Sequence, residues 1–205
     1  MFATLTGLGL STAAGLNAYI PLLVVGVLAN VTDRVRLPAE YAWLSSGWVL
    51  AIIGVLLLAE LVLDKVPVVD HVNDIIQTAV RPASGGVVFS ATTAAAELDN
   101  STWMAEHPGV AWVLGILTAL IVHVVKSTAR PVVNAGTAGL GAPVVSTAED
   151  ASALTLSLVA VFLPVLVVLA LVVFALVGWL AVRRIRRYRA NRRARLAQRG
   201  TAGPA

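Results

Sequence analysis

Ionisable side chains are concentrated in one stretch of a chain that is otherwise almost as apolar as lipid. This stretch holds four of the eleven acidic residues, Glu60, Asp64, Asp70 and Asp74, and one of the three histidines, His71. Residues four apart share a helix face, so the carboxylates form two pairs. Carboxylates with a histidine can ligate hard cations or carry protons along a membrane path. The alternative is that the residues from Asp64 onward lie hydrated at the membrane surface.

A second group of ionisable residues, His123, Lys126 and Arg130, ends another apolar segment. A charge inside a helix bundle of low dielectric constant needs a partner. We therefore expect Glu60, which lies a full turn inside its apolar segment, or Asp64 to pair with Lys126 or Arg130. The alternative for Lys126 is that its long side chain extends to the membrane surface.

Two arginines, Arg81 and Arg130, directly precede prolines, Pro82 and Pro131. Proline interrupts helices, so each arginine would lie beside the beginning of a half-length helix. The backbone N–H groups at such a position, together with a guanidinium, bind anions such as a phosphate headgroup. Anion binding is thus a second reading of the two arginines, beside ion pairing.

The elements that must position these residues are membrane helices. Of the 205 residues, 58% are hydrophobic and only 13% are charged, whereas roughly a quarter of residues are charged in soluble proteins. Hydrophobic runs long enough to cross a bilayer predict an all-α, polytopic transmembrane bundle with four full spans, at residues 3–31, 47–63, 109–125 and 153–182. The first span contains Asn17 and Tyr19 just before Pro21. We expect it to be kinked or broken there, with its polar side chains lining a path or joining helices.

Two further segments are too short to cross alone. The run 87–96 and the glycine-rich stretch 134–143 fit re-entrant or half-length helices. Each follows an Arg-Pro pair and precedes a pair of acidic residues, which favours an inverted repeat whose halves meet near the middle of the membrane. The alternative is two unrelated small-residue helices that pack closely.

The C-terminal tail carries most of the positive charge. Nine of the fifteen basic residues lie between Arg183 and Arg199, directly after an apolar span. This arrangement predicts a transmembrane domain over residues 1–182 and a basic cytoplasmic tail over 183–205, which contacts anionic lipid headgroups and not nucleic acid. The expected location is the inner membrane, with several crossings and a cytoplasmic C-terminus.

Several classes of catalyst find no support in the sequence. The chain has no cysteine, which excludes disulfides, thiolate metal sites and thiol nucleophiles. No Gly-x-Ser-x-Gly motif, phosphate-binding loop or His-Glu-x-x-His motif occurs. We therefore expect no cofactor and do not favour an enzyme, although a membrane enzyme acting on lipid phosphate stays open, as does metal binding.

Three motifs carry a resemblance to a known family. They are Gly15-Leu16-Asn17-Ala18-Tyr19, the run from Asp64 to Asp70, and the corner from Lys126 to Pro131 with the glycine-rich run after it. With these, residues 3–180 resemble small bacterial membrane proteins catalogued as domain of unknown function 4126. The resemblance implies the helical membrane architecture and no particular activity.

The combined expectation is a small membrane channel or secondary transporter for an ion or small solute. The alternative is a membrane scaffold that binds anionic lipid or a partner membrane protein without transport. Glycine-rich faces on the first span and on residues 134–143 would permit a homodimer. The residues expected along the path are Asn17, Tyr19, Glu60, Asp64, Asp70, His71, Asp74, Arg81, His123, Lys126 and Arg130.

Overall fold

The part of the chain that the computed structural model describes contains helices and no strands, which confirms the all-α prediction. The described residues are 2–32, 34–65, 67–95, 107–137 and 141–173, together with 175, 176, 179, 180, 183 and 187. They fall into two compact units, Met1–Ala170 and Leu171–Ala205. In the second unit the Arg183 guanidinium lies 5.1 Å above the ring of Trp179. The helices and the site described below belong to the first unit.

The first apolar segment is broken into two half-length helices, as predicted. Helix α1 spans Phe2–Leu16 and helix α2 spans Tyr19–Val31. The break lies at Asn17 and Ala18, three to four residues before Pro21, where it was expected. Pro21 instead belongs to the first turn of α2, where a missing N–H costs little because that group has no partner within the helix.

A short 3-10 helix and a long apolar helix follow. Helix η1 spans Ala39–Ser45 and α3 spans Gly47–Leu63. The bounds of α3 are those predicted for the second span. The two helices meet at an angle of 58°. Most of the large apolar side chains of α3 are exposed, and its buried residues are Ile53 and Glu60. The helix therefore has a narrow protein-facing stripe that carries a carboxylate.

The two Arg-Pro pairs do not begin new helices, and the prediction of half-length segments there was wrong. Helix α4 runs unbroken through Pro82 from Pro67 to Ala95, and α6 runs through Pro131 from Pro108 to Thr137. A proline removes one hydrogen bond inside a helix, but tight packing offsets this loss. A Cβ atom added to Gly85 would lie 2.6 Å from the Gly115 carbonyl oxygen, so the two backbones are in direct contact.

Helix α7 begins earlier and ends earlier than predicted. It spans Gly141–Phe162, whereas the last span was expected over 153–182. Pro164 explains the early end, because the residue before a proline avoids the helical conformation; residues 165–173 are helical again. The early start places Glu149 and Asp150 inside the helix rather than before it.

The number of candidate membrane spans is smaller than the four predicted. Among the described residues, α6 over Pro108–Ala129 and α7 are each long and apolar enough to cross a membrane, and the bent pair of η1 and α3 raises the number to three. The first segment does not qualify because of its break, and the fourth is divided at Pro164. The inverted repeat stays a prediction.

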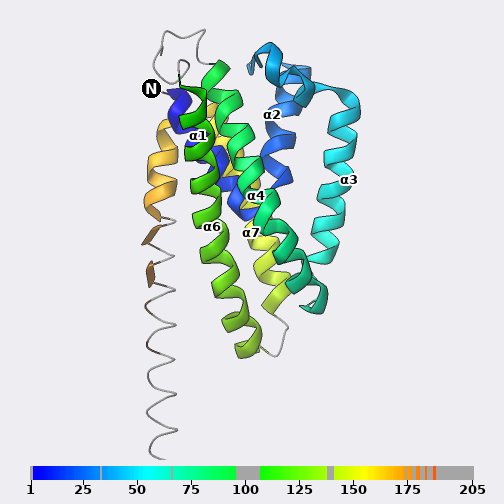
Figure 1. Ribbon diagram of the computed structural model, residues 1–205. Helices are drawn as coiled ribbons and strands as arrows, with labels where there is room; N and C mark the ends of the chain where they lie inside the picture. Colours follow the sequence, from blue (N-terminus) through cyan, green and yellow to red (C-terminus); the bar gives the residue numbers. More distant parts are fainter. Residues whose placement is uncertain are drawn as a thin grey trace, which may run out of the picture. The chain divides into compact units, whose positions relative to one another are not determined.

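Helix α1 forms the centre of the first unit, and α4, α6 and α7 pack around it (Figure 1). Every described residue from Gly9 to Ala18 is buried, as expected for a helix that is enclosed on all sides. Close approach depends on small residues: a Cβ atom on Gly15 would lie 2.6 Å from the Ala119 carbonyl oxygen of α6. In Figure 1, α4 and α6 run side by side in opposite directions.

Candidate functional site

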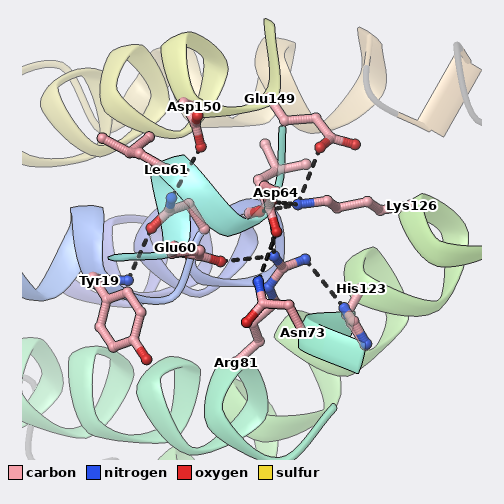
Figure 2. Close-up of polar contacts among 12 residues, drawn as sticks. Tyr19, Glu60, Leu61, Asp64, Asn73, Arg81, His123, Lys126, Glu149 and Asp150 are labelled. Carbon is pink, nitrogen blue, oxygen red and sulfur yellow. Dashed lines mark hydrogen bonds and ion pairs between the residues drawn. The ribbon is translucent and has the colours of Figure 1, made fainter. Parts of the chain in front are cut away.

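Charged and amide side chains from five elements meet at the break between α1 and α2 (Figure 2). Helix α3 supplies Glu60, and Asp64 directly follows that helix. Helix α4 supplies Asn73 and Arg81, and α6 supplies His123 and Lys126. Helix α7 supplies Glu149 and Asp150, and the break itself supplies Asn17. We call these nine residues the buried polar network.

The break between α1 and α2 supplies both hydrogen-bond donors and acceptors, which carry partial positive and partial negative charges. Asn17 Oδ1 accepts hydrogen bonds from the backbone N–H groups of Tyr19 at 3.0 Å and Ile20 at 3.2 Å, and so caps the beginning of α2. Asn17 Nδ2 donates to Asp150 Oδ1 at 2.9 Å. The carbonyl oxygen of Leu16, at the end of α1, faces Lys126. Helix ends carry partial charges of about half a unit, positive where a helix begins and negative where it ends.

Lys126 lies inside the bundle and not at its surface. Its ammonium donates to the Leu16 carbonyl oxygen at 2.7 Å and lies 3.1 Å from Glu149 Oε2 and 3.7 Å from Asp64 Oδ2. Only 2% of the side chain is exposed. The close approach of α1 and α6 at Gly15 brings this lysine to the helix end. A lysine that extends to the membrane surface does not fit this position, and the expected pairing with Asp64 does.

Arg81 is the other cation of the network, and its side chain is fully buried. It donates to Glu60 Oε1 at 2.8 Å and lies 3.8 Å from Asp64 Oδ2. Its Nη1 also lies 3.2 Å from His123 Nδ1. Arginine has no acceptor atom, so Nδ1 must accept this bond and His123 is a neutral imidazole with its hydrogen on Nε2. That Nε2 lies 3.0 Å from Thr78 Oγ1.

Carboxylates outnumber basic groups in the network. Asp64 also accepts a hydrogen bond from Asn73 Nδ2 at 2.7 Å. Arg81 and Lys126 lie among four carboxylates, Glu60, Asp64, Glu149 and Asp150, and the Lys65 ammonium also attracts Asp150. Ionisable groups gathered inside a helix bundle in this way are costly to bury and are typical of proton or ion pathways.

Three side-chain atoms beside the Arg81–Glu60 pair have no hydrogen-bond partner among the residues that the structure describes. They are Glu60 Oε2, Gln77 Oε1 and Arg81 Nε, all buried. An unsatisfied buried polar atom costs about 1–3 kcal/mol. These atoms therefore mark a place where a further polar group would be stabilised.

The structure brings six of the predicted path residues into one network: Asn17, Glu60, Asp64, Arg81, His123 and Lys126. Tyr19 lies next to it, at the beginning of α2. The side chains of the other predicted residues lie outside the described part of the chain, namely Asp70, His71 and Asp74 on α4 and Arg130 on α6. Arg81 is engaged by Glu60, so the anion-binding reading does not fit it.

Three members of the network were not among the predicted path residues: Asn73, Glu149 and Asp150. A signal for the two acids was present in the sequence, because small residues recur at helical spacing on both sides of them. Ser146, Ala153, Ser157 and Ala160 are all buried in α7. Extending that pattern toward the N-terminus would have placed the acids inside the helix.

The chemistry open to the network is the holding and exchange of protons and small cations. Among the described residues, no group of three or more histidine, cysteine, aspartate or glutamate side chains has a geometry that could hold a metal ion. Backbone carbonyls at the end of a half-length helix do, however, coordinate coupling ions in broken-helix transporters, and here the Leu16 carbonyl accepts a hydrogen bond from the Lys126 ammonium.

Comparison with known proteins yields one family. A family model described as a domain of unknown function (DUF4126) matches residues 4–184. This match confirms the family resemblance predicted from the sequence. No curated protein and no solved structure matches the chain.

Proposed function

The chain belongs to the DUF4126 family, whose description assigns no activity, and we propose from its own side chains that it is a small secondary transporter for an ion or small solute. The observation that supports this proposal is the buried polar network at the break between α1 and α2. Two carboxylates and two cations of this network, Glu60, Asp64, Arg81 and Lys126, are buried together. Ionisable groups inside a membrane helix bundle are costly and mark ion or proton pathways.

The arrangement of helices supports a role for α3 as the moving part. The carboxylates nearest Arg81 are Glu60 in the last turn of α3 and Asp64, which directly follows α3. Most large apolar side chains of α3 are exposed, so few contacts hold it against the bundle. A movement of α3 would separate these carboxylates from Arg81 and Lys126 together. Protons or a cation bound at the carboxylates would then be released or taken up on the other side of the membrane.

We place the protein in the inner membrane with its C-terminus in the cytoplasm. The support is the run of basic residues from Arg183 to Arg199 after an apolar segment, because cytoplasmic flanks are enriched in lysine and arginine. Fusing a reporter that is active on only one side of the membrane to residue 205 checks this orientation. Periplasmic activity of the reporter would refute it.

Flux measurements in liposomes test the proposed transport. Purified protein is reconstituted with a pH-sensitive dye inside, and a pH or sodium gradient is imposed. We expect dye signals above those of empty liposomes, and at least about a tenfold loss in Glu60→Gln and Asp64→Asn, because a charge-assisted contact is worth about 1.5–3 kcal/mol.

Glu40→Gln is the matched control, since Glu40 is exposed on η1 and the chemical change is the same. Its flux should equal that of the unaltered protein. Equal flux in all variants would refute the role of the network. No flux above empty liposomes under any gradient would refute transport and leave the scaffold as the better description.

A further inference from the structure

His123 and Glu60 bind different nitrogens of one guanidinium, that of Arg81 (Figure 2). Arg81 Nη1 lies 3.2 Å from His123 Nδ1, and Arg81 Nη2 donates to Glu60 Oε1 at 2.8 Å. All three side chains are buried. The guanidinium is thus shared between a neutral imidazole and a carboxylate, away from bulk water.

The Arg81–Glu60 pair is one hydrogen bond short of the two that it could form. Glu60 Oε2 and Arg81 Nε have no hydrogen-bond partner among the described residues. Nε and Nη2 lie on the same edge of a guanidinium, and together they fit the two oxygens of one carboxylate. A shift of Arg81 toward Glu60 would therefore turn the single hydrogen bond into two parallel ones. The contact of Nη1 with His123 holds the guanidinium in its present position.

His123 Nδ1 can hold Arg81 or a proton, but not both. In the neutral ring this nitrogen has one lone pair, which accepts the hydrogen bond from Arg81, and Nε2 carries the hydrogen. A proton that binds to the ring takes the same lone pair, and both nitrogens of the resulting imidazolium are donors. Arg81 then has no acceptor on His123 and meets a like charge there. Proton binding and the Arg81 contact therefore exclude each other.

Other ionisable groups surround this pair at longer range. Lys126 follows His123 by three residues on α6, and α1, which packs against α6, has no ionisable side chain. The carboxylates of the neighbouring elements contact Arg81, Lys126 or Asn17, and they are Glu60, Asp64, Glu149 and Asp150. The remaining ionisable residues on the first half of α4 have side chains outside the described part, namely Asp70, His71 and Asp74. Arg81 is in direct contact with the ring and is therefore the group that a proton on His123 displaces.

We propose that the proton is the coupling ion of this transporter and that His123 Nδ1 is its binding site. A proton delivered by water binds at Nδ1 while Nε2 keeps its hydrogen, and Arg81 leaves His123 to form its second hydrogen bond with Glu60. The observed arrangement is the proton-free one. Because the proton binds only the other arrangement, it shifts the protein toward that arrangement. This inference rests on the proposed function, because it names the ion that the transporter would use.

Nuclear magnetic resonance of the full-length protein in phosphatidylcholine nanodiscs tests the site without requiring transport. Histidine and arginine are isotope-labelled, and the His123 signals are those that remain after His71→Asn and His107→Asn. At alkaline pH we expect hydrogen on Nε2 alone. On acidification Nδ1 should also gain hydrogen, and the Arg81 Nε–H signal should move in step as it bonds to Glu60. Hydrogen on Nδ1 at alkaline pH, a ring that stays neutral until the protein unfolds, or an Arg81 signal that does not follow His123 would overturn the proposal.

Proton flux into liposomes tests the coupling. His123→Asn keeps an acceptor oxygen at the δ position but takes up no proton. Under an imposed pH gradient its proton flux should fall at least about tenfold, within the range of about 5–150-fold that is typical of coupled sites. His107→Asn is the matched control, because His107 is exposed, and its flux should equal that of the unaltered protein. Unchanged flux in His123→Asn would overturn the proposal, and the resonance measurement decides the question if this variant does not fold.

The two proposals fail in different ways. Proton binding at His123 that moves Arg81, without flux under any gradient, would retain the proton site and refute transport. Flux that follows a sodium gradient alone and is unchanged in His123→Asn would retain transport and refute the proton as its coupling ion.

Discussion

Replacing Arg81 by methionine tests whether the network holds real buried ion pairs. Methionine keeps the length and flexibility of the side chain and removes its charge. The Arg81 side chain is fully buried and lies 2.8 Å from Glu60 and 3.8 Å from Asp64. Its loss leaves Glu60, of which 2% is exposed, without its nearest counter-charge.

Two estimates of the unfolding free energy lost in Arg81→Met agree. Breaking a buried ion pair by removing one partner costs about 3–5 kcal/mol. Glu60 can escape part of this cost by taking up a proton, and protonating an ordinary glutamate at pH 7 costs about 4 kcal/mol, falling to about 1 kcal/mol at pH 5. We therefore expect Arg81→Met to lose about 3–4 kcal/mol of unfolding free energy at pH 7 and clearly less at pH 5.

Thermal unfolding in detergent, followed by tryptophan fluorescence, measures this loss. At roughly 2–4 °C per kcal/mol for a chain of this size, the melting temperature should fall by about 6–16 °C at pH 7.

The double variant Arg81→Met with Glu60→Gln should recover most of the loss, because removing both charges of a buried pair is often nearly neutral. Arg36→Met, at an exposed position, should leave the melting temperature unchanged. A loss below about 1 kcal/mol in Arg81→Met at pH 7, or no recovery in the double variant, would refute the buried pair.

Three further predictions concern the helix contacts around the network. Gly85→Leu should destabilise the protein by more than about 1–3 kcal/mol, since the added atoms meet the backbone of α6, while Gly54→Leu, where no atom lies within 4 Å, should be neutral in the same melting assay. Asn17→Ala should cost about 1–2 kcal/mol by removing the cap of α2 and the donor to Asp150; amide hydrogen exchange at the beginning of α2 should quicken, and unchanged exchange would contradict the capping role. Lys126→Met should remove the cation that the Leu16 carbonyl and Glu149 share, so sodium chloride should raise its melting temperature relative to choline chloride; an equal response of variant and unaltered protein would contradict this.

The parts of the site that the sequence predicted are those whose signal is local. Glu60 stands out because it interrupts an apolar run, and Asp64 follows on the same helix face. Opposite charges in the second half of the chain led to the expected pairing of Asp64 with Lys126, which lie 3.7 Å apart. The break in the first segment was predicted from the helix-breaking residues around Asn17.

The parts that it did not predict depend on contacts between helices distant in sequence. Pro82 indicates a helix end when only its neighbours along the chain are considered, but the packing of Gly85 against α6 keeps α4 continuous. Glu149 and Asp150 look like the polar end of a loop until Lys126 and Asn17 provide partners inside the bundle. Local propensity is overridden in both cases by tertiary packing.

The distribution of the network along the chain has a consequence for biosynthesis. Glu60 precedes Arg81 by 21 residues, and Lys126 follows later still, so the carboxylates of α3 are made before either of their cations. Chains grow and begin to fold from the N-terminus. Glu60 and Asp64 must therefore stay hydrated or carry protons until α4 and α6 have been made. Folding of the first half of this protein should thus be incomplete when synthesis stops before Arg81.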